Sequence, residues 1–95
     1  MNYEWDPAKA SENRRKHGVD FVDAIQALED PTRLEEVDDR RDYGEERMIV
    51  VGLAHTRVLF VVTTTRGEET CRIISARKAT RDEQDQYYSA HSETW

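Results

Sequence analysis

The stretch RMIVVGLAHTRVLFVVTTT, residues 47–65, decides the fold of this 95-residue chain. It contains two apolar runs, RMIVVGLA (47–54) and VLFVVTTT (58–65), which are too short and too rich in β-branched residues to be helices. Only His55-Thr56-Arg57 separates them, so the pattern predicts two antiparallel strands joined by a tight hairpin. Because both runs are continuously apolar, we expect both faces of the sheet to be at least partly covered there.

Further strands are predicted on either side of this hairpin. TRLEEVD (32–38) is polar and alternates weakly, which is typical of an edge strand, and TCRIISAR (70–77) follows a turn at 66–69. Tyr3-Glu4-Trp5 is a short additional strand candidate. Consecutive strands with short turns usually lie side by side. The sequence therefore predicts an antiparallel β-meander of about four strands.

Two helices are predicted before the sheet. Asp6 and Pro7 have the form of a helix start, and Gly18 is well suited to the left-handed position after the last turn. FVDAIQALE (21–29) then carries one apolar stripe with helical spacing and ends at Asp30-Pro31. We expect both N-terminal helices to pack on the sheet.

A short helix is predicted at the other end of the chain. Thr80-x-x-Glu83 has the form of a capping box and opens a helix that reaches about Tyr88. The expected fold is therefore α+β, with a short C-terminal helix. A chain of this length forms one domain, here 1–95, in which we expect 89–95 to be a frayed tail.

Composition and apolar patterning limit the expected cellular location of the protein. The apolar runs are far shorter than the ~20 residues of a membrane span, and the first ten residues have no signal-peptide pattern. Cys71 is the only cysteine, so no intrachain disulfide can form, and a reducing compartment is the simplest interpretation. We expect a cytoplasmic location and no membrane partner.

The formal net charge is −6, but it is unevenly distributed. Residues 47–81 carry a net charge of +5, whereas the flanking segments 35–46 and 82–95 carry −5 and −4. Such blocks decide partner choice rather than fold. The basic block is therefore the part of the chain in which an anionic partner is expected to bind.

Most cations of this block lie at strand ends. Strict alternation along 70–77 predicts Arg77 on the face of Cys71 and Ile73, and Arg72 on the opposite face. In a meander Arg66 lies close to Arg72, while Arg77 lies near the start of the strand 58–65. Several guanidiniums on one sheet would bind phosphates. The alternative is scattered arginines in weak ion pairs with nearby acids.

Other candidate residues give weaker signals. The three histidines lie in separate elements without metal-ligand spacing, and no phosphate-cradling glycine loop occurs, so we expect no metal and no cofactor. Tyr87 and Tyr88 either pack or contribute to base stacking and proton transfer. Lys16-His17 closes the first helix, where a cation is favourable on structural grounds alone.

The order of motifs resembles the BrnT family, the toxins of bacterial type II toxin–antitoxin pairs. The segments that carry the resemblance are WDPAKASENRRKHGVDF (5–21), DAIQALEDP (23–31), YGEERMIVVG (43–52), VLFVVTTTRG (58–67) and RIISARKATRDEQDQY (72–87). The resemblance implies a RelE-like fold and a ribonuclease that arrests translation. It also implies a ribbon-helix-helix antitoxin as partner, with DNA contacted only through that antitoxin, and a two-plus-two heterotetramer.

The resemblance also implies site residues for a metal-independent endoribonuclease. The implied catalytic residues are Arg72, Arg77, Arg66 and Tyr87, and the implied RNA-binding residues are Arg47, Lys78, Lys16 and His17. The net acidity leaves an alternative open, a non-catalytic toxin-like partner that acts with its antitoxin in operon autorepression. A generic interaction module is the third hypothesis.

Overall fold

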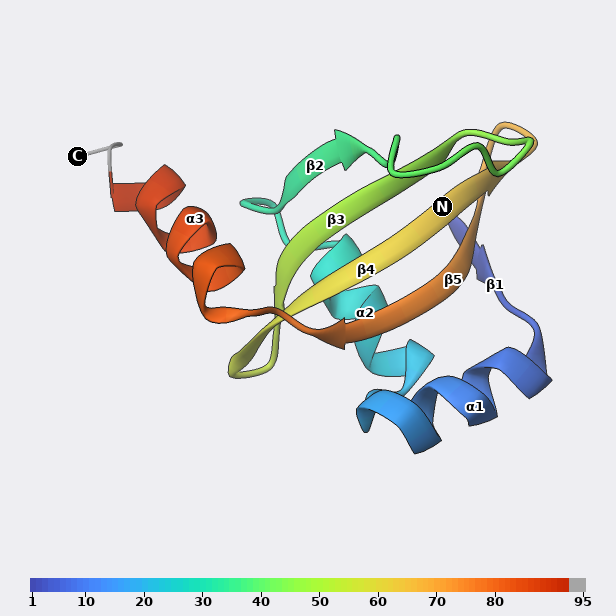
Figure 1. Ribbon diagram of the computed structural model, residues 1–95, viewed down its shortest axis with the longest axis horizontal. Coiled ribbons are helices and arrows are strands. Elements are labelled where there is room, and N and C mark those ends of the chain that lie inside the picture. Colours follow the sequence, from blue (N-terminus) through green and yellow to red (C-terminus); the bar gives the residue numbers. More distant parts are fainter. Residues whose placement is uncertain (93–95) are drawn as a thin grey trace.

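The computed structural model describes residues 1–92, and over these it has the expected α+β architecture of one sheet with helices (Figure 1). The strands are β1 (Asn2–Glu4), β2 (Leu34–Val37), β3 (Arg47–Ala54), β4 (Arg57–Arg66) and β5 (Thr70–Lys78). The helices are α1 (Pro7–His17), α2 (Phe21–Leu28) and α3 (Arg81–Ser92). The strand order is β1-β5-β4-β3-β2. No described helix has the length and apolarity needed to cross a membrane.

The prediction of about four antiparallel strands is corrected by this sheet, which has five strands and is mixed. Strands β2 to β5 do pair antiparallel in chain order. The N-terminal strand β1 adds to the outer edge of β5 in parallel, with Asn2 opposite Thr70 and Glu4 opposite Arg72. Backbone groups at that edge of β5 need partners. The chain supplies them from its N-terminal segment, which contains the strand candidate Tyr3-Glu4-Trp5, but the parallel pairing with β5 is not visible in any local sequence pattern.

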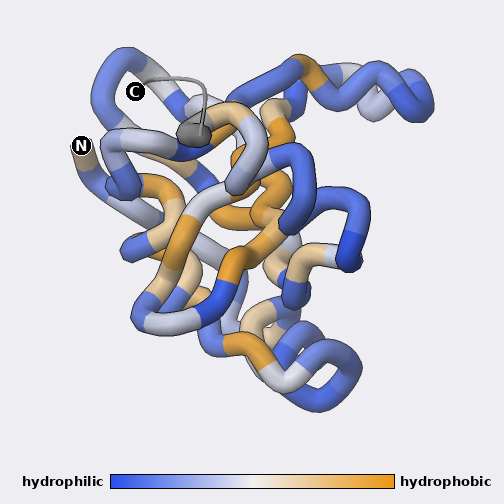
Figure 2. Tube along the Cα trace, turned by 90° about the vertical axis from the view of Figure 1, so that its left-hand side faces the viewer, coloured by the Kyte–Doolittle hydropathy of each residue, from blue (hydrophilic) through white to orange (hydrophobic). Residues whose placement is uncertain are grey.

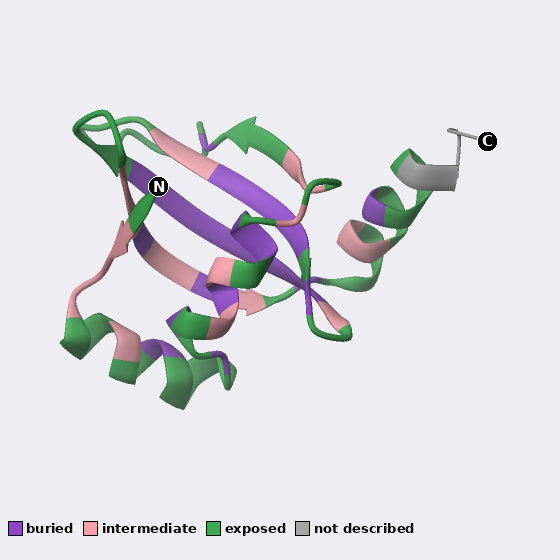
Figure 3. Cartoon of the chain, turned by 180° about the vertical axis from the view of Figure 1, so that it is seen from behind, coloured by how far each residue is buried: buried purple, intermediate pink, exposed green. Residues whose placement is uncertain are grey.

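Helix α2 covers one face of the sheet at close range. Phe21, Ala24, Ala27 and Leu28 are buried against β3, β4 and β5. Figure 3 shows α2 in front of the buried parts of β3 and β4. A Cβ atom at Gly52 would lie 2.2 Å from the carbonyl oxygen of Ala27. Glycine at this position of β3 therefore permits the close approach of the helix.

The opposite face of the sheet carries a second apolar cluster. It contains side chains of the two middle strands together with two from the C-terminal segment: Ile49, Val51, Val58, Phe60, Val62, Ala79 and Tyr87. Helix α3 stands at one end of this face (Figure 1). The expectation that both faces of the middle strands are covered is confirmed. Figure 2 shows the hydrophobic segments inside and the hydrophilic ones around them.

The helix boundaries follow their predicted signals. Asp6 accepts a hydrogen bond from the Ala8 N–H, and Gly18 adopts φ +68° after α1. Thr80 and Glu83 exchange reciprocal side chain–backbone hydrogen bonds of 2.8 and 3.2 Å, which confirms the capping box. Helix α3 extends to Ser92, beyond the predicted end. Within the expected frayed tail, 93–95 lie outside the described residues, so that expectation stays a prediction.

Candidate functional site: an arginine face on the sheet

A β-bulge in β5 decides which side chains meet on the sheet. The register between β4 and β5 shifts between Val62 and Thr63, so that Val62 lies opposite Ser75 and Thr63 opposite Ile73. Ile74 is the extra residue. A bulge of this kind breaks the alternation of side chains along a strand. The prediction that Arg72 and Arg77 lie on opposite faces is therefore wrong, and both lie on the same face.

Four arginines share this face. Arg77 lies opposite Phe60, and Arg72 and Arg47 both lie opposite Thr64, one from each neighbouring strand. Arg66 is two residues beyond Thr64 on β4 and has the same orientation. Residues directly opposite in antiparallel strands project to the same side. We call Arg47, Arg66, Arg72 and Arg77 the arginine face; it lies opposite α1 and α2.

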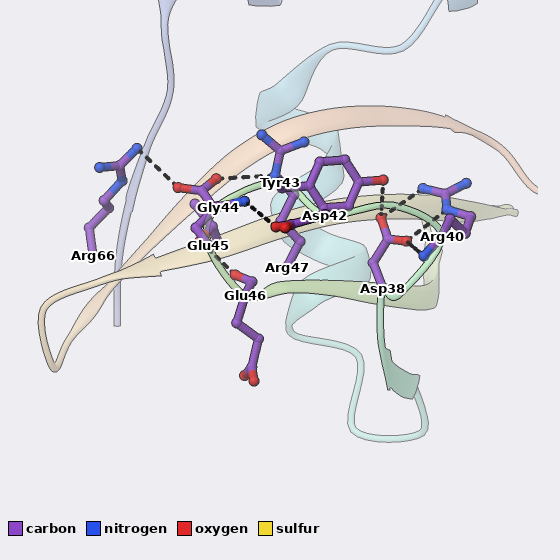
Figure 4. A network of polar contacts seen from close by, with 10 residues as sticks. Asp38, Arg40, Asp42, Tyr43, Gly44, Glu45, Glu46, Arg47 and Arg66 are labelled. Atoms are coloured by element: carbon purple, nitrogen blue, oxygen red, sulfur yellow. Dashed lines mark hydrogen bonds and ion pairs between the residues drawn. The ribbon is translucent and has the colours of Figure 1, made fainter.

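Each arginine of this face has a carboxylate partner. Arg72 Nη1 lies 2.6 Å from Glu4 Oε2, and Arg77 donates two hydrogen bonds of 2.8 and 2.9 Å to Glu83. Glu45 lies between two arginines, 3.1 Å from Arg47 Nε and 3.8 Å from Arg66 Nη2 (Figure 4). The acidic partners therefore offset the positive charge locally.

These ion pairs are accessible to a ligand. The side chains of Arg72 and Arg77 are 27% and 32% exposed, so neither pair is sealed from solvent. The hydrogen bonds from Arg77 hold the pKa of Glu83 below its ordinary value, so that Glu83 is ionised at neutral pH. A phosphate presents oxygen acceptors of the same kind to a guanidinium. A phosphate is therefore an alternative acceptor for the guanidiniums of this face.

The loop between β2 and β3 adds residues that sequence analysis missed. Asp38 is buried, and its carboxylate accepts hydrogen bonds of 2.8 Å from both Nε and Nη2 of Arg40, and one of 3.1 Å from the Tyr43 hydroxyl (Figure 4). The hydrogen bonds from Arg40 hold the Asp38 pKa well below its usual range. In the sequence, Asp38 and Arg40 belong to an acidic run that looks solvated, so no local signal identifies them.

Phe60 connects this loop to the arginine face. The guanidinium carbon of Arg77 lies 3.9 Å from the centroid of the Phe60 ring, and that of Arg40 lies 5.5 Å from it. On the neighbouring strand Arg47 stacks on Tyr43 at 4.1 Å. Guanidiniums bind favourably to aromatic faces. Aromatic rings therefore orient three arginines in this region.

Tyr87 is not on the exposed surface of this face. It is 3% exposed and packs in the second apolar cluster, and its hydroxyl donates to Asp30 Oδ2 and hydrogen-bonds with Thr32 Oγ1. Burial, together with the hydrogen bond to Asp30, raises the pKa of Tyr87. Direct action on RNA would require these hydrogen bonds to break, and the catalytic role of Tyr87 stays a prediction.

The other expected RNA-binding residues are not among the four arginines of this face. Lys78 lies opposite Leu59 and is exposed on the α2 side of the sheet. Lys16 and His17, at the end of α1, line a shallow cavity of about 180 Å³ together with Ser75 on β5. Ser75 lies opposite Val62, so it projects to the same side of the sheet as Arg77. The cavity therefore borders the arginine face at the outer edge of β5. The RNA-binding roles of Lys78, Lys16 and His17 stay predictions.

Metal ligands do not cluster in the part of the chain that the structure describes. No group of three His, Cys, Asp or Glu side chains with suitable geometry occurs among those residues. The chemistry available on the arginine face is that of guanidiniums, carboxylates and hydroxyls. It is suited to binding phosphate and stabilising negative charge.

Comparisons with known proteins identify the family of the chain. A family model described as "Ribonuclease toxin, BrnT, of type II toxin-antitoxin system" matches residues 5–83. The crystal structure of the Brucella abortus ribonuclease toxin BrnT is similar, with a TM-score of 0.63 and 26% sequence identity, over 85% of this chain and 99% of that one. Among curated protein sequences there is no significant match. The family expected from the order of motifs is confirmed: the chain belongs to the BrnT family of ribonuclease toxins of type II toxin–antitoxin systems.

Proposed function

We propose that this chain cleaves RNA, thereby arrests translation, and is neutralised by a cognate antitoxin. The observation that carries the proposal is the placement of Arg47, Arg66, Arg72 and Arg77 on one face of the sheet, opposite α1 and α2. Guanidiniums from three neighbouring strands on one face can bind several phosphates of an RNA strand. Membership of the family supports the same activity.

The reaction we propose is attack by an RNA 2′-oxygen on the adjacent phosphorus. The bond from phosphorus to the 5′-oxygen breaks, which leaves a 2′,3′-cyclic phosphate and a 5′-hydroxyl end. The attacking 2′-hydroxyl must lose a proton, the leaving 5′-oxygen must gain one, and the pentacoordinate phosphorus carries extra negative charge. No water or redox partner is consumed in this step.

The arginines supply the electrostatic part of this reaction. Arginine stays protonated in proteins, so Arg72 and Arg77, with Arg66 as a third cation, stabilise the developing charge rather than transfer protons. We therefore propose metal-independent cleavage. We propose Tyr87 for proton transfer, and Lys16, His17, Arg47 and Lys78 for RNA binding beyond the cleaved bond.

The partners of the chain are proposals of the same kind. We propose a ribbon-helix-helix antitoxin, a two-plus-two complex in which only the antitoxin contacts DNA, a cytoplasmic location, and a RelE-like relationship of the fold. A single domain over 1–95 is also part of the proposal. The type II toxin–antitoxin family supports the antitoxin partner.

The test is incubation of the purified chain with RNA in the presence of EDTA, followed by analysis of the product ends. The proposal predicts cleavage with 5′-hydroxyl ends in the chelator, and loss of cleavage in Arg77→Ala. Arg57→Ala is the matched control because Arg57 lies on the other face of β4. Intact RNA with folded protein, on free RNA and on translating ribosomes, would overturn the proposal.

A non-catalytic role in operon autorepression is the second candidate. The observation that favours it is that all four arginines of the face are engaged by carboxylates, in a chain of net charge −6. It predicts tight antitoxin binding without RNA cleavage. The same purified chain, tested for antitoxin binding and for RNA cleavage, distinguishes the two candidates.

A further inference from the structure

Arg40, in the loop 38–46, is held in place by a buried carboxylate. Its side chain is 54% exposed, whereas the side chain of its partner, Asp38, is 0% exposed. Asp38 also accepts from the backbone N–H of Arg40 at 3.2 Å and from the Tyr43 hydroxyl. A buried carboxylate with four hydrogen bonds has a fixed orientation. The guanidinium of Arg40 is therefore fixed at one edge while the rest of it faces outward.

The same guanidinium shares an aromatic ring with Arg77. Both lie on Phe60, so their guanidinium carbons are no further apart than the two ring distances of 3.9 and 5.5 Å combined. Each is also bound to its own carboxylate through two nitrogens, Arg40 to Asp38 and Arg77 to Glu83. Two guanidiniums that contact one ring can bind the same phosphate or two adjacent phosphates of one strand.

We propose that Arg40 is an additional ligand for the phosphate backbone of RNA, that it binds beside Arg77, and that Asp38 is the positioning residue that holds it over Phe60. The inference rests on the proposed function, because it assigns a further residue to the same RNA site. It extends the arginine face from the sheet onto the loop 38–46. Glu83 orients the guanidinium of Arg77 in the same way that Asp38 orients that of Arg40.

The test is the salt dependence of binding to a single-stranded oligoribonucleotide with 2′-O-methyl groups, which cannot be cleaved. For single strands, loss of one phosphate contact lowers the slope of log affinity against log salt by about 0.7. We expect this decrease for Arg40→Gln and for Arg77→Gln. Arg41→Gln is the matched control, because it removes the same charge from the neighbouring exposed position. We expect its slope to remain that of the wild type.

Asp38→Asn tests the positioning role separately. Removal of a negative charge from the chain should strengthen RNA binding on electrostatic grounds alone. We expect the opposite for Asp38→Asn, weaker binding with a slope like that of Arg40→Gln, because the amide no longer holds both nitrogens of Arg40. Asp39→Asn is the control with the same charge change, and we expect binding equal to or tighter than that of the wild type.

The outcomes separate this inference from the function on which it rests. A folded wild-type chain that neither binds nor cleaves RNA overturns both. Weaker binding by Arg77→Gln, with Arg40→Gln identical to Arg41→Gln, overturns the role of Arg40 and leaves the proposed function intact. If Asp38→Asn does not fold, the comparison of Arg40→Gln with Arg41→Gln decides, since both remove a side chain that is exposed to solvent.

Discussion

Asn13 of α1 hydrogen-bonds to both backbone groups of Ala76 in β5. Its amide nitrogen donates to the Ala76 carbonyl at 2.8 Å, and its amide oxygen accepts from the Ala76 N–H at 3.1 Å. The same nitrogen donates to the Val19 carbonyl at 3.1 Å. Strand β1 covers only the first three residues of β5. Further along this edge, the Asn13 side chain makes the two backbone hydrogen bonds that a neighbouring strand would otherwise make.

The first prediction concerns this amide. Asn13→Ala leaves the buried N–H and carbonyl of Ala76 without partners, and we expect it to lower the free energy of unfolding by about 2–4 kcal/mol. Urea denaturation of the purified protein measures this loss. Ser11→Ala, on the exposed side of α1, is the control and should change stability by less than about 0.5 kcal/mol. Equal stability of the two variants would show that α1 does not depend on this contact.

The second prediction concerns the distance between α2 and β3. In Gly52→Ala the new methyl group would lie 2.2 Å from the Ala27 carbonyl oxygen, so the helix has to move away from the sheet. We expect a loss of about 3 kcal/mol or more, at the upper end of overpacking costs. Gly44→Ala is the comparison. It has open space around it but φ +72°, so only backbone strain of about 1–2 kcal/mol is expected.

The third prediction is a pH dependence of stability that arises from the contact between Asp30 and Tyr87 of α3. Burial alone would raise the Asp30 pKa, but hydrogen bonds from Tyr87, the Leu53 N–H and Thr32 together lower it to about 2. A lowered folded-state pKa stabilises the protein above the unfolded-state pKa of about 3.9, and this contribution is lost as the pH falls toward 2. Tyr87→Phe removes one of these donors. We expect lower stability at neutral pH and a smaller further loss between pH 4 and pH 2.

Thermal unfolding across this pH range tests the difference. Tyr88→Phe is the control, because Tyr88 is adjacent in sequence and 52% exposed. We expect its pH profile to overlie that of the wild type. A Tyr87→Phe profile parallel to the wild-type profile would contradict a coupling between the Tyr87 hydroxyl and the ionisation of Asp30.

The fourth prediction concerns the carboxylate between two arginines. Glu45→Gln removes the negative charge beside Arg47 and Arg66, so RNA binding at low salt should strengthen several-fold. Glu46→Gln removes the same charge from the next residue, whose side chain points away from the arginines in Figure 4. We expect a clearly smaller gain from it. Equal gains would mean that net charge matters and the local pairing does not.

Some of this structure was predictable because its causes are local. Asp6, Gly18 and the Thr80–Glu83 box act within a few residues of their own positions, and they were identified correctly. The apolar runs of the hairpin specify pairing with each other in the same way. These signals reflect backbone conformations and short-range hydrogen bonds, for which particular residue types at fixed spacing are preferred.

Other features depend on contacts between distant segments. The bulge at Ile74 moves Arg77 to the face of Arg72, and its position depends on which partners β4 presents to β5. The parallel addition of β1 depends on an edge about 70 residues away in sequence. The position of Arg40 over Phe60 depends on a carboxylate that is buried only in the folded loop. Periodicity carries no information about these contacts.

The most direct test of the arginine face is expression of the chain alone from a tightly repressed promoter in a bacterium, with growth and total RNA followed after induction. The comparison is with Arg72→Ala/Arg77→Ala and with Arg15→Ala/Arg57→Ala, which removes two arginines that lie outside the face. Protein level and thermal stability are measured for each variant.

We predict growth arrest with RNA cleavage for the wild type and for Arg15→Ala/Arg57→Ala, and the loss of both effects for a folded Arg72→Ala/Arg77→Ala. Normal growth and intact RNA with well-expressed wild-type protein would contradict the account and favour the non-catalytic role. Arrest that persists in the folded Arg72→Ala/Arg77→Ala variant would place the RNA site elsewhere on the molecule.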